Sequence, residues 1–276
     1  MRRAARFLVR SLAFTGIRLT RVLDSLSRGA ALASFTATEL DALAVDEWEA
    51  FGDGPGVGDE LFPWEKAFFA DHVHQGDAIL VVGAGTGRDV LPFLETGHRV
   101  AALDITPRSL AVLEQRARDR GLTATTITAS IVSARLAPQS FDVVVFSWFC
   151  FGYLRGPGER AAALERASSS LRPQGRILIT YPTRPLGPDN ASSWAKSLSR
   201  ILARLLGGVA AETGEHVNLS GSASKPGVFF SHRVAPAEIE EEVRKAGLTI
   251  RAHDQPSSSV GRIALCVTKG AAPTRA

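Results

Sequence analysis

The sequence predicts an α/β fold in which helices cover both faces of a mostly parallel sheet. Three observations support this fold class: short apolar runs bounded by turn residues, stretches of helix-forming composition between them, and a close group of glycines directly after the first run. The apolar runs at 79–82 and 141–146 are continuous rather than alternating, which is typical of strands buried on both faces of a parallel sheet. We expect seven strands in this sheet.

The stretch from residue 78 to residue 104 predicts a ligand site. Its first strand is followed by glycines at alternate positions, which let the backbone turn steeply and approach a ligand. A helix at 88–95 then begins with its N-terminus facing the same place. The second strand, 99–103, ends at Asp104, where a carboxylate is placed to accept hydrogen bonds from ribose hydroxyls. The stretch therefore predicts an adenosine-containing ligand.

The remaining elements follow the same alternation of strand and helix. In chain order they are expected at 107–121 (helix), 124–128 (strand), 141–146 (strand), 158–171 (helix), 176–181 (strand), 192–206 (helix), 235–246 (helix), 248–253 (strand) and 262–268 (strand). Before the first strand, residues 36–75 read as helix interrupted by a Gly-rich loop at 53–58, with a helix start at Thr38.

Composition limits the classes of protein. A chain of 276 residues with 45% hydrophobic and 22% charged residues is ordinary for a soluble globular protein, and it contains no run of eighteen apolar residues. Cys150 and Cys266 have no metal-ligand spacing, so we expect reduced thiols in a cytoplasmic protein.

The net charge of +4 is unevenly distributed along the chain. Residues 1–30 contain seven arginines and a single acid, Asp24, which gives this segment a charge of +6 and leaves −2 for the remainder. The basic pI is therefore no indication of a nucleic-acid-binding body, and we expect no nucleic-acid partner. Arginines and leucines of this segment recur at helical spacing on two different sides. Such a helix fits three roles: contact with an anionic membrane surface, part of a lid, or packing on the parent domain.

The glycine spacing distinguishes between cofactors. A dinucleotide fingerprint requires a third glycine where this chain has Arg88, and the pattern is G-x-G-x-G instead. In this form, with Asp104 at the next strand end, the stretch resembles the first motifs of class I S-adenosylmethionine-dependent methyltransferases. The resemblance implies a Rossmann-like class I methyltransferase fold, with S-adenosyl-L-methionine as cofactor and S-adenosyl-L-homocysteine as product. The cofactor-binding residues that it implies are Gly83, Ala84, Gly85, Gly87, Asp104, Ile105, Ser130, Ile131 and Ser147.

The sequence differs from the family's usual pattern at one cofactor-binding position. At the end of the fourth strand it disfavours two types of methyltransferase. After the third strand the family usually has an acidic residue for the adenine amino group, where this chain has Ser130. The fourth strand runs into Ser-Trp-Phe-Cys at 147–150 rather than the Asn/Asp-Pro-Pro-aromatic sequence of base amino-methyltransferases. The acidic residues of the metal-dependent catechol type are also missing from their places, so we expect no metal.

The later part of the chain extends the resemblance and predicts the domain organisation. A helix, the sequence Leu-Arg-Pro-x-Gly and an apolar strand look like the late motif of the same family, so the resemblance covers roughly residues 76–183. We expect an N-terminal helical cap at 1–75 and a methyltransferase domain at 76–270. An insertion at 184–233, before the last hairpin, is expected to form a lid over the substrate.

Two side chains are candidate catalytic residues. Methyl transfer from a sulfonium is an in-line displacement in which a general base is optional, and histidine suits that role near neutral pH. His232 lies in the expected lid region, where a purely structural hydrogen-bonding role is the alternative, and Tyr153 is a candidate for orienting the acceptor. The candidate walls of the substrate pocket are Trp64, Trp148, Phe149, Phe151 and Phe230.

Three functions remain open at this stage. The first is metal-free methylation of a small apolar or aromatic molecule, suggested by the aromatic residues after the fourth strand. The second is methylation of a lipid or isoprenoid at a membrane surface, supported by the basic segment 1–30. The third is a non-catalytic cofactor-binding protein. The apolar face expected on the helix at 192–206 is also a candidate homodimer contact.

Overall fold

The computed structural model describes residues 16, 20, 23, 26–52, 60–183, 193–210, 215–222, 225–254 and 262–269. The chain divides into two compact units. The larger unit contains residues 45–185 and 231–276, and the smaller unit contains residues 1–44 and 186–230. Each unit is described by itself.

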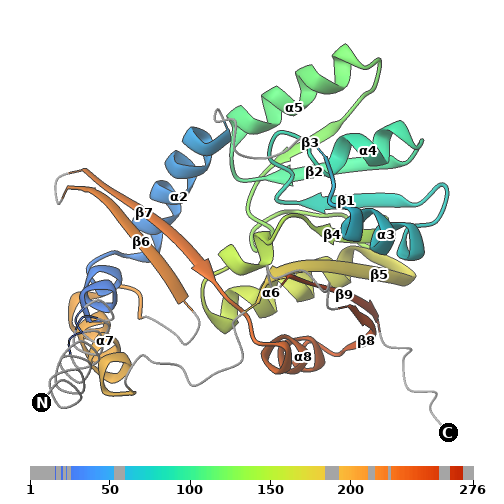
Figure 1. The fold of residues 1–276 in the computed structure, drawn as a ribbon. Helices are drawn as coiled ribbons and strands as arrows, with labels where there is room; N and C mark the ends of the chain where they lie inside the picture. Colours follow the sequence, from blue (N-terminus) through green and yellow to red (C-terminus); the bar gives the residue numbers. More distant parts are fainter. Residues whose placement is uncertain are drawn as a thin grey trace, which may run out of the picture. The chain divides into compact units, whose positions relative to one another are not determined.

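The larger unit is built on a sheet with strand order β3-β2-β1-β4-β5-β9-β8 (Figure 1). Strands β3, β2, β1, β4 and β5 run parallel to one another, and β9 runs antiparallel to both β5 and β8. The predicted Rossmann-like α/β fold with a largely parallel sheet is confirmed. The strands are β1 (Ala78–Val82), β2 (Arg99–Asp104), β3 (Thr125–Thr128), β4 (Phe141–Phe146), β5 (Leu171–Pro182), β8 (Leu248–Asp254) and β9 (Arg262–Lys269).

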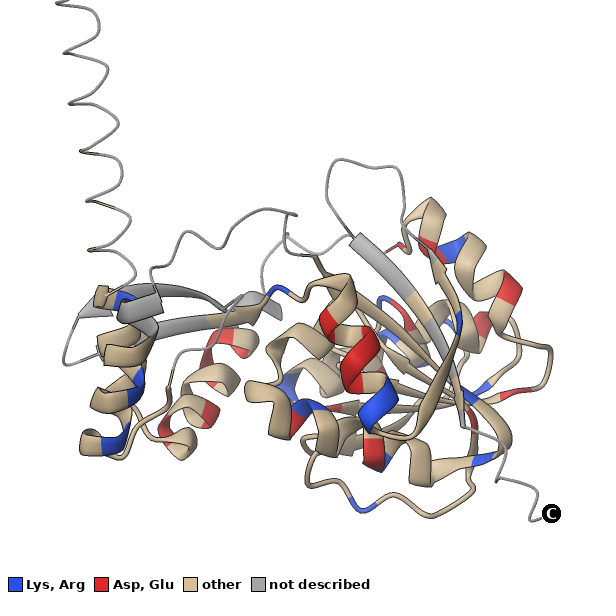
Figure 2. Cartoon of the chain, turned by 90° about the horizontal axis from the view of Figure 1, so that it is seen from below, with Lys and Arg blue, Asp and Glu red and all other residues tan. Residues whose placement is uncertain are grey.

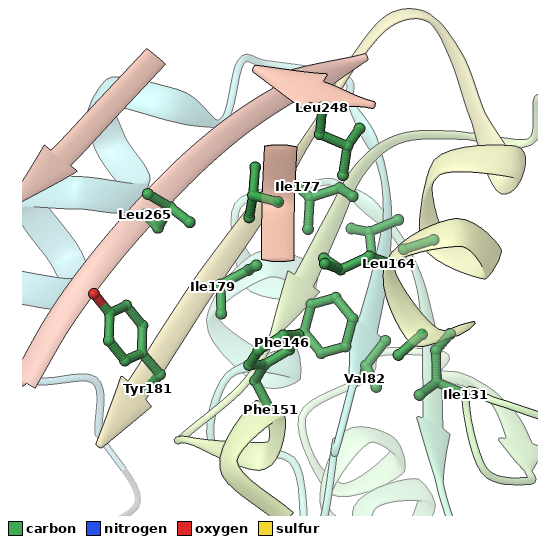
Figure 3. Packing of buried hydrophobic residues seen from close by; sticks show 14 of the residues in the cluster. Val82, Ile131, Phe146, Phe151, Leu164, Ile177, Ile179, Tyr181, Leu248 and Leu265 are labelled. Atoms are coloured by element: carbon green, nitrogen blue, oxygen red, sulfur yellow. The ribbon is translucent and has the colours of Figure 1, made fainter. Parts of the chain in front are cut away.

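Helices cover both faces of this sheet because the side chains of each strand alternate between two apolar clusters. Leu80 and Val82 of β1 belong to a cluster shared with α6 and α8, whereas Ile79 and Val81 face a cluster shared with α3, α4 and α5. Part of the first cluster is drawn in Figure 3. The helices are α3 (Pro63–His72), α4 (Val90–Glu95), α5 (Pro107–Asp119), α6 (Gly156–Ser170) and α8 (Pro236–Lys245), with a 3-10 turn, η1, at Cys150–Tyr153.

The smaller unit combines the N-terminal part of the chain with the segment that leaves the sheet after β5. Its elements are a helical stretch at 26–33, the first half of α2 (Ala37–Gly52), α7 (Ser193–Leu206), β6 (Glu215–Ser222) and most of β7 (Lys225–His232). Leu32 and Leu40 form its buried apolar centre. The chain after α7 approaches the N-terminal segment so closely that a Cβ on Gly208 would lie 1.9 Å from the carbonyl oxygen of Ala33.

The structure differs from the sequence-based expectations at several boundaries. Helix α2 starts at Ala37 rather than at Thr38 because Thr36 and Glu39 form a capping box, in which the Thr36 amide donates to Glu39 Oε2 at 2.8 Å. Helix α4 starts at Val90 rather than at Arg88. No element was predicted at 215–222, and the structure has strand β6 there, which pairs with β7. Most of the predicted helix at 1–30 and the Gly-rich loop at 53–58 lie outside the described residues.

The described residues include no helix that is both long enough and apolar enough to span a membrane.

Candidate active site

The glycine turn between β1 and α4 lies at the carboxyl ends of the parallel strands. Gly83, Gly85 and Gly87 have φ values of +72°, +50° and +99°. Residues other than glycine adopt such positive φ values only at a cost of roughly 1–2 kcal/mol. The amides of Gly83 and Ala84 both donate to the carbonyl of Leu103 on β2. The three glycines therefore hold a left-handed turn against the end of the neighbouring strand.

The glycines are needed for two different reasons. A Cβ on Gly83 would lie 2.5 Å from Cβ of Cys150, and one on Gly87 would lie 2.4 Å from Cδ1 of Leu113, so both positions have no room for a side chain. A Cβ on Gly85 would meet no heavy atom within 4 Å. The backbone at Gly85 therefore borders open space, as is required where a turn makes close contact with a ligand.

Asp104 is held at this turn by three hydrogen bonds. Its Oδ2 accepts from the Gly85 amide at 2.7 Å, and its Oδ1 accepts from the amide and the hydroxyl of Thr106 at 2.9 and 2.6 Å. A carboxylate offers about four lone-pair sites, so roughly one remains, on Oδ2. The half-buried carboxylate therefore has a fixed direction and retains acceptor capacity beside the open space at Gly85.

The residues after β3 are placed next to the same strand ends. The amide of Ala129 donates to the carbonyl of Asp104 at 2.9 Å, which brings the segment after β3 to the end of β2. Ser130 caps the following turn through its backbone carbonyl, and Ile131 is buried in the cluster that contains Val82 and Leu103. Ser130 and Ile131 thus stand at the expected edge of the sheet.

The end of β4 has an unusual backbone conformation. Trp148 and Phe149 are consecutive residues with φ of +30° and +61°, although neither is glycine. Such conformations cost of order 1–3 kcal/mol each and concentrate at functional sites. The amide of Phe149 donates to the Thr180 hydroxyl at 3.2 Å, and the Ser147 amide donates to the Val82 carbonyl at 3.0 Å. Neighbouring strands β5 and β1 therefore hold the turn in place.

Aromatic rings gather around this turn. The ring of Phe62 is stacked with Trp64 and lies 5.4 Å from the ring of Trp148, which in turn lies 5.8 Å from Phe149. The guanidinium of Arg88 stands 4.5 Å from the centre of the Trp148 ring and 5.1 Å from that of Phe62, within cation–π range. The residues at the start of α3 and after β4 thus form one aromatic wall, centred on Arg88.

Arg88 also joins two buried carboxylates. It forms an ion pair with Glu65 of α3, and its Nη1 donates to Oδ1 of Asp89 at 2.6 Å. All three side chains are at most 6% exposed. Burial raises the pKa of Glu65, and the nearby Asp89 charge raises it further against the opposing effect of Arg88. Burial likewise raises the pKa of Asp89, opposed by Arg88 and by the Ser147 side chain.

Arg88, Glu65 and Asp89 form a buried triad with two carboxylates for one guanidinium. Two atoms of this triad have unused hydrogen-bonding capacity. Within the described part of the chain, Nε of Arg88 and Oδ2 of Asp89 have no hydrogen-bond partner although both atoms are buried. The Ser147 side chain is close enough to influence Asp89, so the triad borders the end of β4 as well as the glycine turn. The triad therefore fixes α3 and the start of α4 around the predicted ligand position.

Cys150 and Tyr153 have environments that keep both side chains protonated. Burial raises the pKa of the Cys150 thiol, and the charges of Asp104 and Asp89 raise it further, so the thiol is a packing group rather than a nucleophile. Burial also raises the pKa of the Tyr153 phenol. The Tyr153 ring packs edge-on against Trp48 at 4.6 Å. A neutral phenol suits a hydrogen-bonding role better than that of a base.

Three other predicted site residues lie in different surroundings. Phe151 is fully buried in the core and packs edge-on against Phe146 at 5.4 Å (Figure 3). Phe230 packs on the apolar centre of the smaller unit. The buried ring of His232 contacts Glu238 of α8, with 2.8 Å between Nε2 and Oε1. Whether His232 acts as a base stays a prediction.

Sequence reasoning missed the parts of this site that depend on long-range packing. Phe62, Arg88 and Asp89 were not assigned to the site, although a charged pair directly after the glycine turn was a usable signal. The cap at the start of α3, in which Oε2 of Glu65 accepts from the Phe62 amide, was not recognised either.

Among the residues that the structure describes, no three His, Cys, Asp or Glu side chains come together in a way that would hold a metal ion. The expectation of a metal-free site stays a prediction.

The fold agrees with comparisons to known proteins. Residues 79–175 match the protein family described as Methyltransferase domain. This part of the chain contains β1, the turn, β2, β3, β4 and the start of β5, and it has the class I Rossmann-like α/β fold that methyltransferases share.

Relatives and solved structures point to the same class. A demethylmenaquinone methyltransferase of Tropheryma whipplei (strain Twist) is 32% identical over 121 residues, which are 42% of this chain and 47% of that protein. A cypemycin N-terminal methyltransferase from Streptomyces sp. is 27% identical over 166 residues, or 59% of this chain and 64% of that protein. The chain thus spans about half to two thirds of the length of these relatives.

One solved structure is a 1,6-didemethyltoxoflavin-N1-methyltransferase of Burkholderia thailandensis with bound 1,6-didemethyltoxoflavin and S-adenosylhomocysteine. It has a TM-score of 0.56 and 20% identity, covering 83% of this chain and 87% of that one. A glycopeptide N-methyltransferase complexed with S-adenosylmethionine has a TM-score of 0.56 and 18% identity, covering 79% and 90%. These likenesses establish the shared fold.

Proposed function

We propose that this protein is an S-adenosylmethionine-dependent methyltransferase that acts on a small apolar or aromatic molecule. The observation that carries the proposal is the open position at Gly85, whose amide is fixed by Asp104 at the end of the adjacent strand. A turn of this kind presents backbone groups to a ligand and places a carboxylate beside it, as an adenosine-containing cofactor requires. The methyltransferase domain match at 79–175 supports this choice of cofactor.

Each group in the site has a proposed role toward the cofactor. The turn formed by Gly83, Ala84, Gly85 and Gly87 would lie against its methionine part, and Asp104 would accept a hydrogen bond from the ribose. Ile105, Ser130 and Ile131 would border the adenosine, and Ser147 would stand near the methionine part. S-adenosylmethionine supplies an activated methyl group and leaves as neutral S-adenosyl-L-homocysteine.

The protein's own residues would orient the acceptor and exclude water. An in-line displacement needs the acceptor lone pair on the axis of the breaking bond, which a rigid wall can enforce. Trp148 and Phe149 are held in strained conformations by strands β1 and β5, so their positions are fixed before an acceptor arrives. Tyr153, with its raised pKa, would donate a hydrogen bond to the acceptor.

The chemistry of the site also suggests the class of acceptor. The wall combines Phe62, Trp64, Trp148 and Phe149 with one guanidinium, so it suits a flat apolar molecule. Glu65 and Asp89 are already engaged by Arg88, which favours methyl transfer without a metal ion. Relatives named for demethylmenaquinone and didemethyltoxoflavin support an aromatic acceptor.

The test is transfer of a labelled methyl group from S-adenosylmethionine to a panel of aromatic acceptors, including 1,6-didemethyltoxoflavin and a short-chain demethylmenaquinone. We expect label on at least one acceptor and a lower kcat for Tyr153→Phe, with an unchanged affinity for the cofactor. Micromolar cofactor binding without transfer to any acceptor would favour the non-catalytic alternative instead.

A further inference from the structure

Helix α7 of the smaller unit exposes the large apolar side chains that a helix normally buries. Leu205 is 76% exposed, Leu206 60% and Ile201 52%, and Leu198 is exposed as well. Apart from Leu23, these are the large hydrophobic residues that stand exposed among the described residues. Single apolar residues scattered over a surface are ordinary, but several exposed apolar side chains on one helix indicate an interaction site.

The opposite side of α7 is the side that packs, and it consists of small residues. Ser199 and Ala203, one turn apart, are at most 5% exposed. The Ser199 hydroxyl donates to the carbonyl of Gly29 at 3.2 Å, and a Cβ on Gly29 would lie 3.0 Å from Cβ of Ser199. The helical stretch at 26–33 therefore closes the small-residue side of α7 and leaves the leucine side uncovered within this unit.

Basic residues line the boundary between these two sides. Arg200 and Arg204 are four residues apart on α7, so they lie in one stripe along the helix, and the helix contains no acidic residue. Arg200 and Arg204 are exposed, and Figure 2 colours the charged residues of the described chain. The smaller unit has eleven Lys and Arg against six Asp and Glu, hence +5, which leaves −1 for the larger unit of the +4 chain.

We propose that α7 is a docking surface for an anionic lipid bilayer. The helix would lie in the plane of the interface, with Leu198, Ile201 and Leu205 among the acyl chains and Arg200 and Arg204 at the level of the headgroups. An apolar face with an adjacent basic stripe and no acidic residue is the pattern of helices that bind at the membrane surface. Long arginine side chains reach the phosphates while their aliphatic parts stay in the apolar layer.

Charge favours a bilayer over a second copy of the chain as the occupant. Two copies that joined their apolar faces would bring the stripes containing Arg200 and Arg204 close together with no acidic residue on either helix to pair with them. An anionic bilayer supplies the opposite charge along the whole stripe, in addition to an apolar layer for the leucines. The proposal does not depend on the methyltransferase activity.

The experiment is cosedimentation of the full-length protein with vesicles of equal parts phosphatidylglycerol and phosphatidylcholine, compared with vesicles of phosphatidylcholine alone. We expect binding to the anionic vesicles that weakens as salt is added, because salt screens exposed charges. Each arginine near an anionic surface contributes about 1 kcal/mol, so Arg200→Glu/Arg204→Glu should weaken binding at least about tenfold. Ile201→Ser/Leu205→Ser should weaken it by a similar factor, because less apolar surface is buried.

The matched control is Arg135→Glu/Arg166→Glu, which changes the net charge equally at two exposed arginines of the larger unit. It should retain most of the vesicle binding. Calorimetric titration of every variant with S-adenosylmethionine checks the larger unit separately, so a loss of cofactor binding is distinguishable from a loss of vesicle binding.

The proposal would be overturned if the wild-type protein did not bind anionic vesicles, or if the α7 variants bound them as tightly as the wild type does. A dimer that Ile201→Ser/Leu205→Ser dissociates while vesicle binding persists would assign the face to a second copy instead.

Discussion

At the scale of single residues, the site depends on positions where a side chain is either impossible or required. The glycine turn and Asp104 could be predicted from the sequence because both are local: the turn needs left-handed backbone, and the carboxylate follows the next strand. The cluster around Arg88 could not be predicted in this way. Its partner Glu65 is 23 residues earlier in the chain, and only the packing of α3 against α4 brings the two together.

The glycine turn gives a prediction that separates folding from cofactor binding. Gly85→Ala should cost only about 1 kcal/mol of stability, because its Cβ enters open space and the penalty is the left-handed backbone alone. The same Cβ would enter the proposed cofactor position, so affinity for S-adenosylmethionine should fall at least about tenfold. Thermal unfolding and calorimetric titration measure the two effects.

Gly76→Ala is the control for this prediction. Gly76 also has positive φ, +85°, and open space around its Cβ position, but it lies in the turn before β1. Gly76→Ala should lose about as much stability as Gly85→Ala and should keep the wild-type affinity for the cofactor. Equal loss of affinity in both variants would show that Gly85 does not face the ligand.

At the scale of elements, the buried triad connects α3 with the start of α4. Replacing Arg88 by methionine would leave Glu65 and Asp89 buried without their cation, and breaking a buried pair in this way costs about 3–5 kcal/mol. We therefore expect Arg88→Met to destabilise the protein strongly at pH 7 in denaturant unfolding. Arg118→Met removes an exposed ion pair with Glu114 and should cost less than about 1 kcal/mol.

The loss of stability in Arg88→Met should also depend on pH, in a direction that the pKa shifts predict. Arg88 lowers the pKa of both carboxyls against the effect of burial, so its loss should raise both pKa values in the folded state further. A carboxyl whose pKa is raised on folding stabilises the protein below its unfolded pKa, and this stabilisation disappears as the pH rises through the folded pKa. The deficit of Arg88→Met relative to wild type should therefore shrink as the pH falls from 7 toward 5. A deficit that stays constant would mean that the carboxylates are not buried as described.

At the scale of the whole molecule, the chain divides into two compact units, and the N-terminal cap and the lid stay predictions. The N-terminal segment and the residues after β5, which are far apart in sequence, share one compact unit. Sequence periodicity identified the helix at 193–206, but it could not show that the small-residue side of this helix would pack on residues 26–33. The strands and the largely parallel sheet of the larger unit followed from the alternation of apolar strands and helices, whereas this pairing depends on contacts between distant segments.

The division into two units predicts that the smaller one can be disturbed separately. Gly208→Ala would place a Cβ 1.9 Å from the backbone oxygen of Ala33, so the chain must shift there. Hydrogen exchange should become faster in 26–44 and 193–210, while affinity for S-adenosylmethionine stays within about twofold. The neighbouring Gly207→Ala, which has positive φ but open space, should cost only about 1 kcal/mol. A parallel loss of cofactor binding in Gly208→Ala would contradict this independence.

Calorimetric titration with S-adenosylmethionine and S-adenosyl-L-homocysteine, on wild type, Asp104→Asn and Asp104→Ala, tests the cofactor assignment most directly. We expect micromolar binding of both ligands to wild type. Asp104→Ala should lose about 1–3 kcal/mol, the range for a hydrogen bond to a charged group, and Asp104→Asn should lose less because it keeps one acceptor oxygen. Folded wild-type protein that binds neither ligand would contradict the assignment of this site to S-adenosylmethionine.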